Sequence, residues 1–338
     1  MFINKKYRRP INLLIKVVVT LYLCILLYKQ VWMRNNSLDL WKAFYLSFQS
    51  ENLQWLLLAA FSMPINWGFE ALKWQKITER FAHLSLWTSI KATYAGAMVG
   101  IFTPNRVGEF GGKILWLLPE QQGKGIVASF VGSAGQFIAI LLGGGPAVLY
   151  FLHCTYHNIP EFWLWMLFGT EVLLLFVLLF LFYNIDVFLK MLHRLPIPKF
   201  ALRYLEHVKI LKKYSVQDLS WALWYSILRY VVYALQYYWM LRFFDIDVTV
   251  DVGIAGIATV FLFQTIVPLP SLAGLLVRGE LAIQVWGFFT TNHINILATT
   301  FGLWLINVII PALIGWIFII NKNVIHSLGY DEEPLEKH

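Results

Sequence analysis

The chain has 338 residues, of which 59% are hydrophobic and only 14% are charged. A soluble domain typically carries about 25% charged residues, so the composition excludes an ordinary soluble globular protein and predicts a polytopic membrane protein. The formal net charge of +8 is explained by basic cytoplasmic loops, and we therefore expect no nucleic-acid partner.

The N-terminal region predicts a cytoplasmic start. Residues 1–16 contain five basic side chains and precede an apolar run at 17–32. No small-residue cleavage site follows that run, so we interpret it as a retained first helix whose N-terminus is cytoplasmic. A second helix is expected at 53–69, with Pro64 as a kink. The basic residues after it predict a return to the cytoplasmic side: Lys73, Lys76, Arg80 and Lys91.

Apolar runs predict four further helices, at 126–152, 162–183, 219–241 and 296–320. Between the second and third of these, residues 186–215 alternate apolar with basic side chains. That pattern is typical of a cytoplasmic amphipathic segment lying on an anionic leaflet. A polar turn at 119–124 precedes the first of the four helices. The predicted transmembrane region therefore covers 17–320, and a polar tail follows at 321–338.

Two stretches, 92–118 and 256–281, interrupt this pattern with prolines and charges. The first lies between two segments that are both predicted to be cytoplasmic, so it should enter and leave the membrane on one side. The second begins on the outer side, after the acidic loop 242–251, and returns there if the last helix runs inward. We therefore predict an all-α bundle of about six spans with two re-entrant hairpins. Hairpins that enter from opposite faces would form an inverted repeat with a site near the midplane.

Charged residues at membrane depth are the candidate functional groups, because each costs roughly 2.5–3.5 kcal/mol on insertion scales. Six positions are of this kind, and their charges balance: Arg106, Glu109, Glu171, Arg229, Arg278 and Glu280. Arg106 and Glu109 are three residues apart and can share a helix face. Glu171 and Arg229 lie on separate predicted spans, where they could pair. Two interpretations stay open: structural ion pairs that lock the hairpins, or an anion-binding centre.

In the second interpretation the hairpin tips bind phosphate. Pro104 and Pro270 lie where a helix would restart and present free N–H groups. Arginine is a bidentate phosphate donor, and glycines at 108, 111 and 112 would allow close backbone approach. Arg106 and Arg278 would hold phosphate, while Glu109 and Glu280 would orient them or couple a proton. The full candidate set is Thr103, Pro104, Arg106, Gly108, Glu109, Pro268, Pro270, Arg278 and Glu280, with Lys113, Glu171 and Arg229 secondary.

Other motifs give weaker indications of function. His153 and His157 have the spacing of a metal pair but lack a third ligand. Asp245 and Asp247 resemble the acidic pair with which glycosyltransferases hold a metal, yet their loop is very short. The two cysteines suggest no disulfide framework. We therefore predict no metal, cofactor or catalytic residue.

The segment Thr103–Lys113, TPNRVGEFGGK, closely resembles the first hallmark of the lysylphosphatidylglycerol synthase transmembrane-region family, also called flippase-like domain proteins. Pro268–Glu280 resembles its second hallmark, a proline–glycine-rich turn ending in Arg-Glu. Here the turn reads Pro-Ser-Leu-Ala-Gly where the family usually has Pro-Gly-Gly-x-Gly, and Gly279 separates the arginine from the glutamate. In length and helix pattern the resemblance covers nearly the whole chain.

The resemblance implies an integral membrane domain of the kind that moves lipids between leaflets in two-domain synthases. Those synthases also carry a soluble aminoacyl-transferase domain, for which this chain has no long soluble stretch, so we expect it not to make aminoacyl lipids by itself. The leading prediction is a translocase or binder, in the inner cell membrane, of an anionic phospholipid or a polyprenyl-phosphate precursor.

Two alternatives remain. The chain would be a membrane transferase acting on lipid-linked sugar, with the outer aspartates as metal ligands. Or it would be a non-catalytic membrane partner of a separately encoded transferase. Assembly as a homo-oligomer is compatible with each of these functions.

Overall fold

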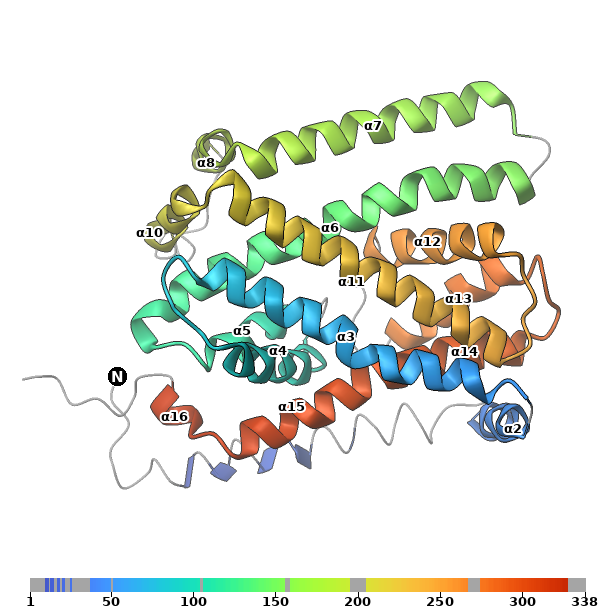
Figure 1. Ribbon diagram of the computed structural model, residues 1–338, viewed down its shortest axis with the longest axis horizontal. Helices are drawn as coiled ribbons and strands as arrows, with labels where there is room; N and C mark the ends of the chain where they lie inside the picture. The colour runs from blue at the N-terminus through green and yellow to red at the C-terminus, as the bar shows by residue number, and fades with distance from the viewer. Residues whose placement is uncertain are drawn as a thin grey trace, which may run out of the picture.

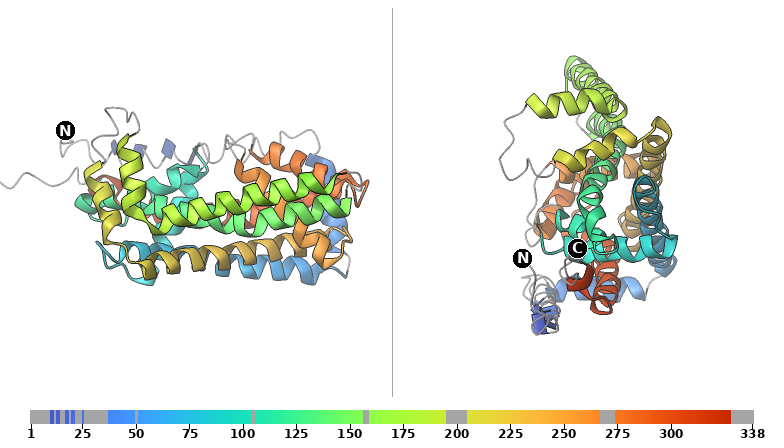
Figure 2. Two further views of the ribbon diagram at one scale, coloured as in Figure 1. Left: turned by 90° about the horizontal axis from the view of Figure 1, so that it is seen from above. Right: turned by 90° about the vertical axis from the view of Figure 1, so that its left-hand side faces the viewer.

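The computed structural model describes residues 37–49, 51–103, 106–155, 159–194, 205–266 and 274–327, together with separate residues between positions 10 and 25. Within these ranges every regular element is a helix and none is a strand. The predicted all-α architecture is confirmed for this part of the chain. The longest helices lie side by side along the long axis of the molecule (Figures 1 and 2).

The helices follow one another in this order: α2 (Ser37–Phe48), α3 (Leu53–Thr78), α4 (Leu86–Gly100), α5 (Gly108–Ile114), α6 (Pro119–Thr155), α7 (Glu161–Tyr183), α8 (Ile185–Arg194), α10 (Leu205–Val208), the 3₁₀ turn η2 (Lys209–Lys213), α11 (Val216–Phe243), α12 (Val250–Ile266), α13 (Gly274–Trp286), α14 (His293–Trp304), the π-helical segment η3 (Leu305–Ile309), α15 (Ile310–Ile320) and α16 (Val324–Ser327).

Among the described residues, three helices are long and apolar enough to cross a membrane: Pro119–Thr155, Glu161–Tyr183 and His293–Ile320. The protein is therefore compatible with a membrane location, as its composition predicted. Helices α3 and α11 have 26 and 28 residues, about 39 and 42 Å at 1.5 Å per residue, but both carry buried charges. The predicted first helix at 17–32 lies mostly outside the described residues. One described contact places Thr20 on α15, where the Trp316 indole donates to its hydroxyl at 2.9 Å.

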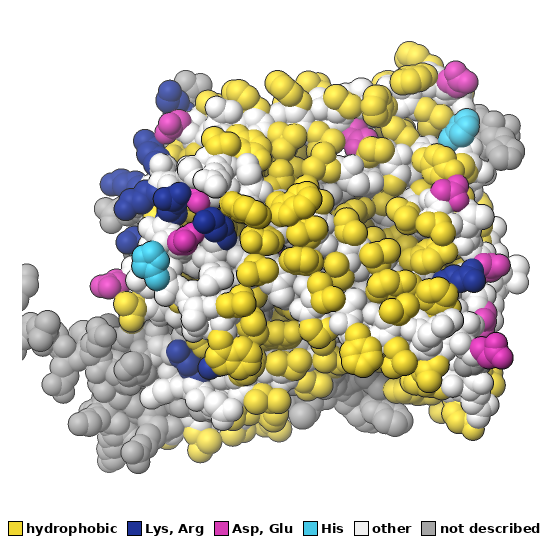
Figure 3. Space-filling model, viewed as in Figure 1, with side chains coloured by type: hydrophobic (Ala, Val, Ile, Leu, Met, Phe, Trp, Pro, Cys, Tyr) yellow, Lys and Arg dark blue, Asp and Glu magenta, His cyan; other side chains and the backbone are white. Residues whose placement is uncertain are grey.

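The surface shows an apolar band between two charged ends (Figure 3). Lysines and arginines gather at the end that holds the α7–α11 connection, and carboxylates dominate the opposite end. Helix α7 has an 18-residue apolar window of which none is buried inside the protein. Such a surface is suited to lipid chains rather than water. The basic end is the one that the positive-inside rule predicts to be cytoplasmic, and that orientation stays a prediction.

Helices α4 and α5 form one hairpin, α12 and α13 form another, and the two lie toward opposite ends of the bundle (Figure 1). Their arms have 15 and 7 residues in the first hairpin and 17 and 13 in the second. Over these described lengths, at 1.5 Å per residue, no arm reaches the roughly 30 Å of a hydrocarbon core. A re-entrant hairpin needs arms too short to span the membrane, and these arms are of that length. The re-entrant hairpins and the inverted repeat both stay predictions.

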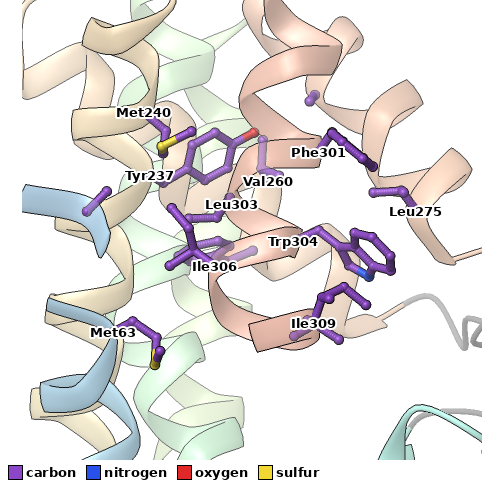
Figure 4. Packing of buried hydrophobic residues seen from close by; sticks show 14 of the residues in the cluster. Met63, Tyr237, Met240, Val260, Leu275, Phe301, Leu303, Trp304, Ile306 and Ile309 are labelled. Carbon is purple, nitrogen blue, oxygen red and sulfur yellow. The ribbon is translucent and has the colours of Figure 1, made fainter. Parts of the chain in front are cut away.

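The main hydrophobic core joins α11, α14 and the second hairpin (Figure 4). Tyr237 and Met240 pack there with Phe301 and Trp304, and all four are buried. The Trp286 indole donates to the Tyr237 hydroxyl at 3.2 Å, so this buried polar pair is satisfied. Because lipid tails are as apolar as this core, its tight packing contributes more to helix association than hydrophobic transfer does.

Helix α4 is held between α5 and α15 by glycine contacts. A Cβ atom on Gly112 would collide with the Ala95 carbonyl, and one on Gly315 would collide with the Tyr94 carbonyl. Small residues let helix backbones approach closely in a membrane. The first hairpin is therefore fixed against the last helix by residues that have no side chain.

Several predicted boundaries were wrong. The second helix was expected to end at residue 69 but runs to Thr78, because Lys73 is neutralised inside the bundle by Glu70 at 2.7 Å. The polar turn expected at 119–124 is instead the first part of α6, whose N-terminal Pro119 suits a helix start. Within the predicted last helix, Leu305–Ile309 adopts π-helical geometry.

Candidate anion-binding site

A buried ionic network lies at the middle of the bundle, and the Glu70 carboxylate is its hub. The Lys73 ammonium lies 2.7 Å from Glu70, the Lys113 ammonium 2.7 Å, and the Arg229 guanidinium 2.9 Å. The Glu70 side chain is only 5% exposed. One carboxylate thus links α3, which carries Glu70 and Lys73, to α5 and α11.

The network continues through Glu109 on α5. Its carboxylate lies 2.8 Å from the Lys113 ammonium and 3.5 Å from the Arg106 guanidinium. Four basic side chains, Lys73, Lys113, Arg229 and Arg106, therefore face the two carboxylates Glu70 and Glu109. The network carries an excess of positive charge.

Indole rings support the arginines and one lysine. The Arg106 and Arg229 guanidinium carbons lie 5.5 and 5.3 Å from the Trp67 ring centroid. The Lys113 ammonium lies 5.6 Å from the Trp74 ring centroid. Cation–π contacts of this kind contribute up to about 2 kcal/mol when desolvated. Aromatic faces thus stabilise cations where carboxylates are too few.

A cavity of about 180 Å³ adjoins this network. Arg106 reaches it from the connection between α4 and α5, Arg229 from α11 and Arg278 from α13. None of the described residues that line the cavity is acidic. Aromatic and amide side chains complete much of its wall: Asn66, Trp67, Gln136, Tyr230, Tyr233, Phe261, Gln264 and Asn307.

Two of these arginines have unused hydrogen-bond donors. Nε and Nη2 of Arg106 and Nε of Arg278 are buried and have no hydrogen-bond partner within the described part of the chain. Arg106 also has a positive φ of 58°, a conformation that costs a non-glycine residue roughly 1–2 kcal/mol. Strained, underused cations of this kind are typical of ligand sites.

Thr103 and Gly108 close the turn of the first hairpin. The Gly108 N–H donates to the Thr103 hydroxyl at 2.6 Å. A Cβ on Gly108 would lie 2.6 Å from the Val99 carbonyl oxygen, whereas a Cβ on Gly111 would meet nothing within 4 Å. The glycines at 108 and 112 therefore serve the close α4–α5 contact, and the Gly108 N–H is already occupied. The predicted site residues Pro104, Pro268 and Pro270 lie outside the described residues.

Glu280 and Glu171 lie apart from the lining residues. Glu280 is exposed on α13 and accepts a hydrogen bond from Gln284 at 3.3 Å. Glu171 packs on Gly145, where a Cβ would overlap its carboxylate, and its Oε1 is buried with no hydrogen-bond partner among the described residues. The pair that Glu171 and Arg229 could have formed is not present, because α11 packs along α3 and Arg229 binds Glu70 instead.

The network and cavity include residues that the sequence did not single out. Glu70 follows directly after the predicted helix 53–69 and Lys73 was assigned to the cytoplasmic side, yet both are buried. Their i,i+3 spacing was the available signal, since it allows an ion pair within one helix. Gln136 and Asn307 are amides within apolar helices, and such positions are functional candidates for the same reason as charges.

The three aspartates between positions 245 and 251, which are predicted to face outward, are each engaged separately. Asp245 accepts from Asn52 at 2.5 Å, Asp247 pairs with Arg242, and Asp251 accepts from the Tyr150 hydroxyl at 2.5 Å. In the described ranges no three His, Cys, Asp or Glu side chains are grouped so that they could hold a metal ion. The three aspartates therefore do not form a shared site.

Comparison with known proteins adds no family assignment to this geometry. No protein-family model matches the chain, and no curated protein matches its sequence. The likeness to the lysylphosphatidylglycerol synthase transmembrane region therefore rests on the two motifs themselves, Thr103–Lys113 and Pro268–Glu280.

Proposed function

We propose that this protein binds an anionic lipid, either a phospholipid or a lipid-linked precursor, and moves its headgroup across the inner cell membrane. The observation that carries the proposal is the convergence of Arg106, Arg229 and Arg278 on one cavity. Two of the three come from the two separate hairpins. Arginine is the side chain best suited to bidentate contact with phosphate.

Electrostatics supports an anionic ligand. Buried unpaired charge is costly in a membrane, and Arg278 forms no ion pair with any described residue. An anion in the cavity would compensate Arg278 and complete the hydrogen bonding of Arg106. Glu70 and Glu109 would keep the remaining cations in place without reaching the ligand, because neither lines the cavity.

The position of the cavity supports translocation as well as binding. Arg229 is at the middle of α11 (Val216–Phe243) and Trp67 is at the middle of α3 (Leu53–Thr78). A site at mid-depth between two hairpins is the arrangement that alternating-access transporters use. In this proposal a headgroup reaches the same arginines from either face, one hairpin at a time.

A proteoliposome assay with a headgroup-labelled anionic phospholipid tests the proposal. Replacement by Arg106→Gln or Arg278→Gln should lower the translocation rate about 10- to 100-fold, the loss of one charge-assisted hydrogen-bonding group. Lys42→Gln removes a basic residue that is 76% exposed on α2, and we expect it to leave the rate unchanged. Wild-type rates in both arginine variants would refute the proposed role of the cavity.

A further inference from the structure

The cavity wall also contains unused hydrogen-bond acceptors. Oε1 of Gln136 and Oδ1 of Asn307 are buried and have no hydrogen-bond partner in the described part of the protein. Asn66, which lines the same cavity, is satisfied: its Oδ1 accepts from Arg229 at 3.0 Å and its Nδ2 donates to Gln236 at 3.2 Å. An unpaired buried acceptor costs roughly 1–3 kcal/mol. Two such acceptors in one cavity indicate a ligand that supplies donors.

Asn307 is placed in the wall by an unusual piece of backbone. It is the central residue of the π-helical segment η3 (Leu305–Ile309) and is only 5% exposed. Its Nδ2 donates back to the Leu303 carbonyl at 3.4 Å, so Oδ1 is the atom left for a ligand. Single π turns inside α-helices occur frequently at functional sites.

We propose that the ligand is a phosphodiester whose headgroup carries hydroxyl groups, such as glycerol or a sugar, and that it carries no amine. This inference rests on the proposed function of the cavity and specifies its ligand. Phosphate oxygens accept from the free donors of Arg106 and Arg278, and headgroup hydroxyls donate to Gln136 and Asn307. The phosphate and hydroxyl groups match the unpaired atoms of Arg106, Arg278, Gln136 and Asn307. Nε1 of Trp67, in the same wall, is a further buried donor that has no hydrogen-bond partner among the described residues.

An ammonium headgroup supplies donors too, but the charges oppose it. The three arginines of the cavity repel a second cation, and no described lining residue is a carboxylate that would bind one. Like charges at close range cost several kcal/mol. Zwitterionic and aminoacylated headgroups are therefore excluded from the proposed ligand class.

Binding of three lipids to the purified full-length protein in nanodiscs tests the inference. Phosphatidylglycerol and phosphatidylmethanol carry the same phosphodiester charge, but only the first has headgroup hydroxyls; phosphatidylethanolamine has an amine instead. We expect phosphatidylglycerol to bind at least about fivefold more tightly than phosphatidylmethanol, the effect of one hydrogen bond, and phosphatidylethanolamine to bind most weakly. Equal affinity for the first two lipids would overturn the inference and leave the proposed function intact, whereas no binding of either would overturn both.

Variants of the two acceptors provide the second readout. Gln136→Met and Asn307→Leu keep the side-chain size. Each variant should reduce the ratio of phosphatidylglycerol affinity to phosphatidylmethanol affinity, and the double variant should abolish the preference. If Asn307→Leu fails to fold, the reduction in Gln136→Met decides alone. An undiminished preference in the folded variants would contradict the assigned acceptors.

The same hydroxylated phosphate chemistry occurs in water-soluble molecules. Glycerol 3-phosphate should displace phosphatidylglycerol only at concentrations at least about 100-fold above those of the lipid, because it lacks the acyl chains that the apolar band contacts. Displacement at equal concentration would show that the ligand is the soluble molecule, and it would overturn the lipid source without affecting the headgroup assignment.

Discussion

The Glu70 carboxylate is the main counter-ion of the buried cations in this protein. It contacts Lys73, Lys113 and Arg229 within 2.9 Å, and the cations around it outnumber the anions. Removing one partner of a buried ionic group leaves the remaining charges uncompensated. This costs more free energy than replacing the whole group by apolar side chains. The network therefore depends on Glu70 more than on any single cation.

Glu70→Gln should lower the free energy of unfolding by about 3–5 kcal/mol, because three buried cations lose their shared counter-ion. Denaturant unfolding in detergent, followed by circular dichroism, measures this change. The matched control is Glu79→Gln on the same helix end, where the Glu79 side chain is 51% exposed and pairs with Lys76. An exposed pair contributes at most about 1 kcal/mol. Similar losses in the two variants would contradict the hub role of Glu70.

At the residue scale, the three arginines of the cavity can be identified from the sequence more reliably than their ionic partners. Arg106, Arg229 and Arg278 were conspicuous because each stands in an apolar stretch, and the structure brings them to one cavity. Glu70 was passed over because the basic residues after it suggest a loop. The choice between Glu70 and Glu171 as partner of Arg229 depends on which helices touch, and hydropathy contains no information about that.

At the scale of elements, α4 and its two neighbours are positioned by backbone contact. Gly112 of α5 faces the Ala95 carbonyl of α4, and Gly315 of α15 faces the Tyr94 carbonyl. The adjacent Gly111 faces open space. On this short helix, position 112 therefore has no space for a Cβ atom, whereas position 111 has space for one.

Gly112→Ala and Gly111→Ala form a matched pair. Gly112→Ala should destabilise the protein by about 1–3 kcal/mol, since the new methyl group meets α4 backbone atoms that cannot rearrange. Gly111→Ala should raise stability by about 0.5–1 kcal/mol, because alanine favours the helix and nothing obstructs it. Thermal unfolding of both variants in the same detergent makes the comparison. Shifts of the same sign would argue against the α4–α5 contact.

Sequence patterns predicted the existence of the long helices better than their ends. The predicted 162–183 and the observed Glu161–Tyr183 nearly coincide, because that helix is apolar throughout and bounded by polar residues. The predicted 53–69 is nine residues too short at its C-terminal end, because side chains on other helices neutralise Lys73. A charged residue therefore marks the end of a helix only where no side chain of opposite charge neutralises it.

At the scale of the whole molecule, charge is separated along the long axis. The end with η2 and α8 is rich in lysine, and the end with Asp245, Asp247 and Asp251 is acidic (Figure 3). By the positive-inside rule we propose that the first end faces the cytoplasm. In that proposed orientation the α4–α5 hairpin opens to the cytoplasmic face and the α12–α13 hairpin opens to the outer face.

Cysteine labelling in intact cells tests this orientation. In a background with Cys24→Ser and Cys154→Ser, an Asp247→Cys variant should react with a membrane-impermeant maleimide from outside. A Lys212→Cys variant should react only after the cells are permeabilised. Both positions are well exposed, at 87% and 62% of the side chain, so access depends on the side of the membrane. The reverse labelling pattern would invert the topology.

The π segment η3 sets the rotational phase between the two halves of the last helix. Before it, α14 packs on α13 of the second hairpin; after it, α15 packs on α4 of the first hairpin. Each residue of an α-helix advances the chain by about 100°, and a π turn holds one residue more than an α turn. Deleting one residue from Leu305–Ile309 would therefore turn Gly315 about 100° away from Tyr94. This single wide turn sets the rotation of α15 relative to α14, so that one continuous helix packs on both hairpins.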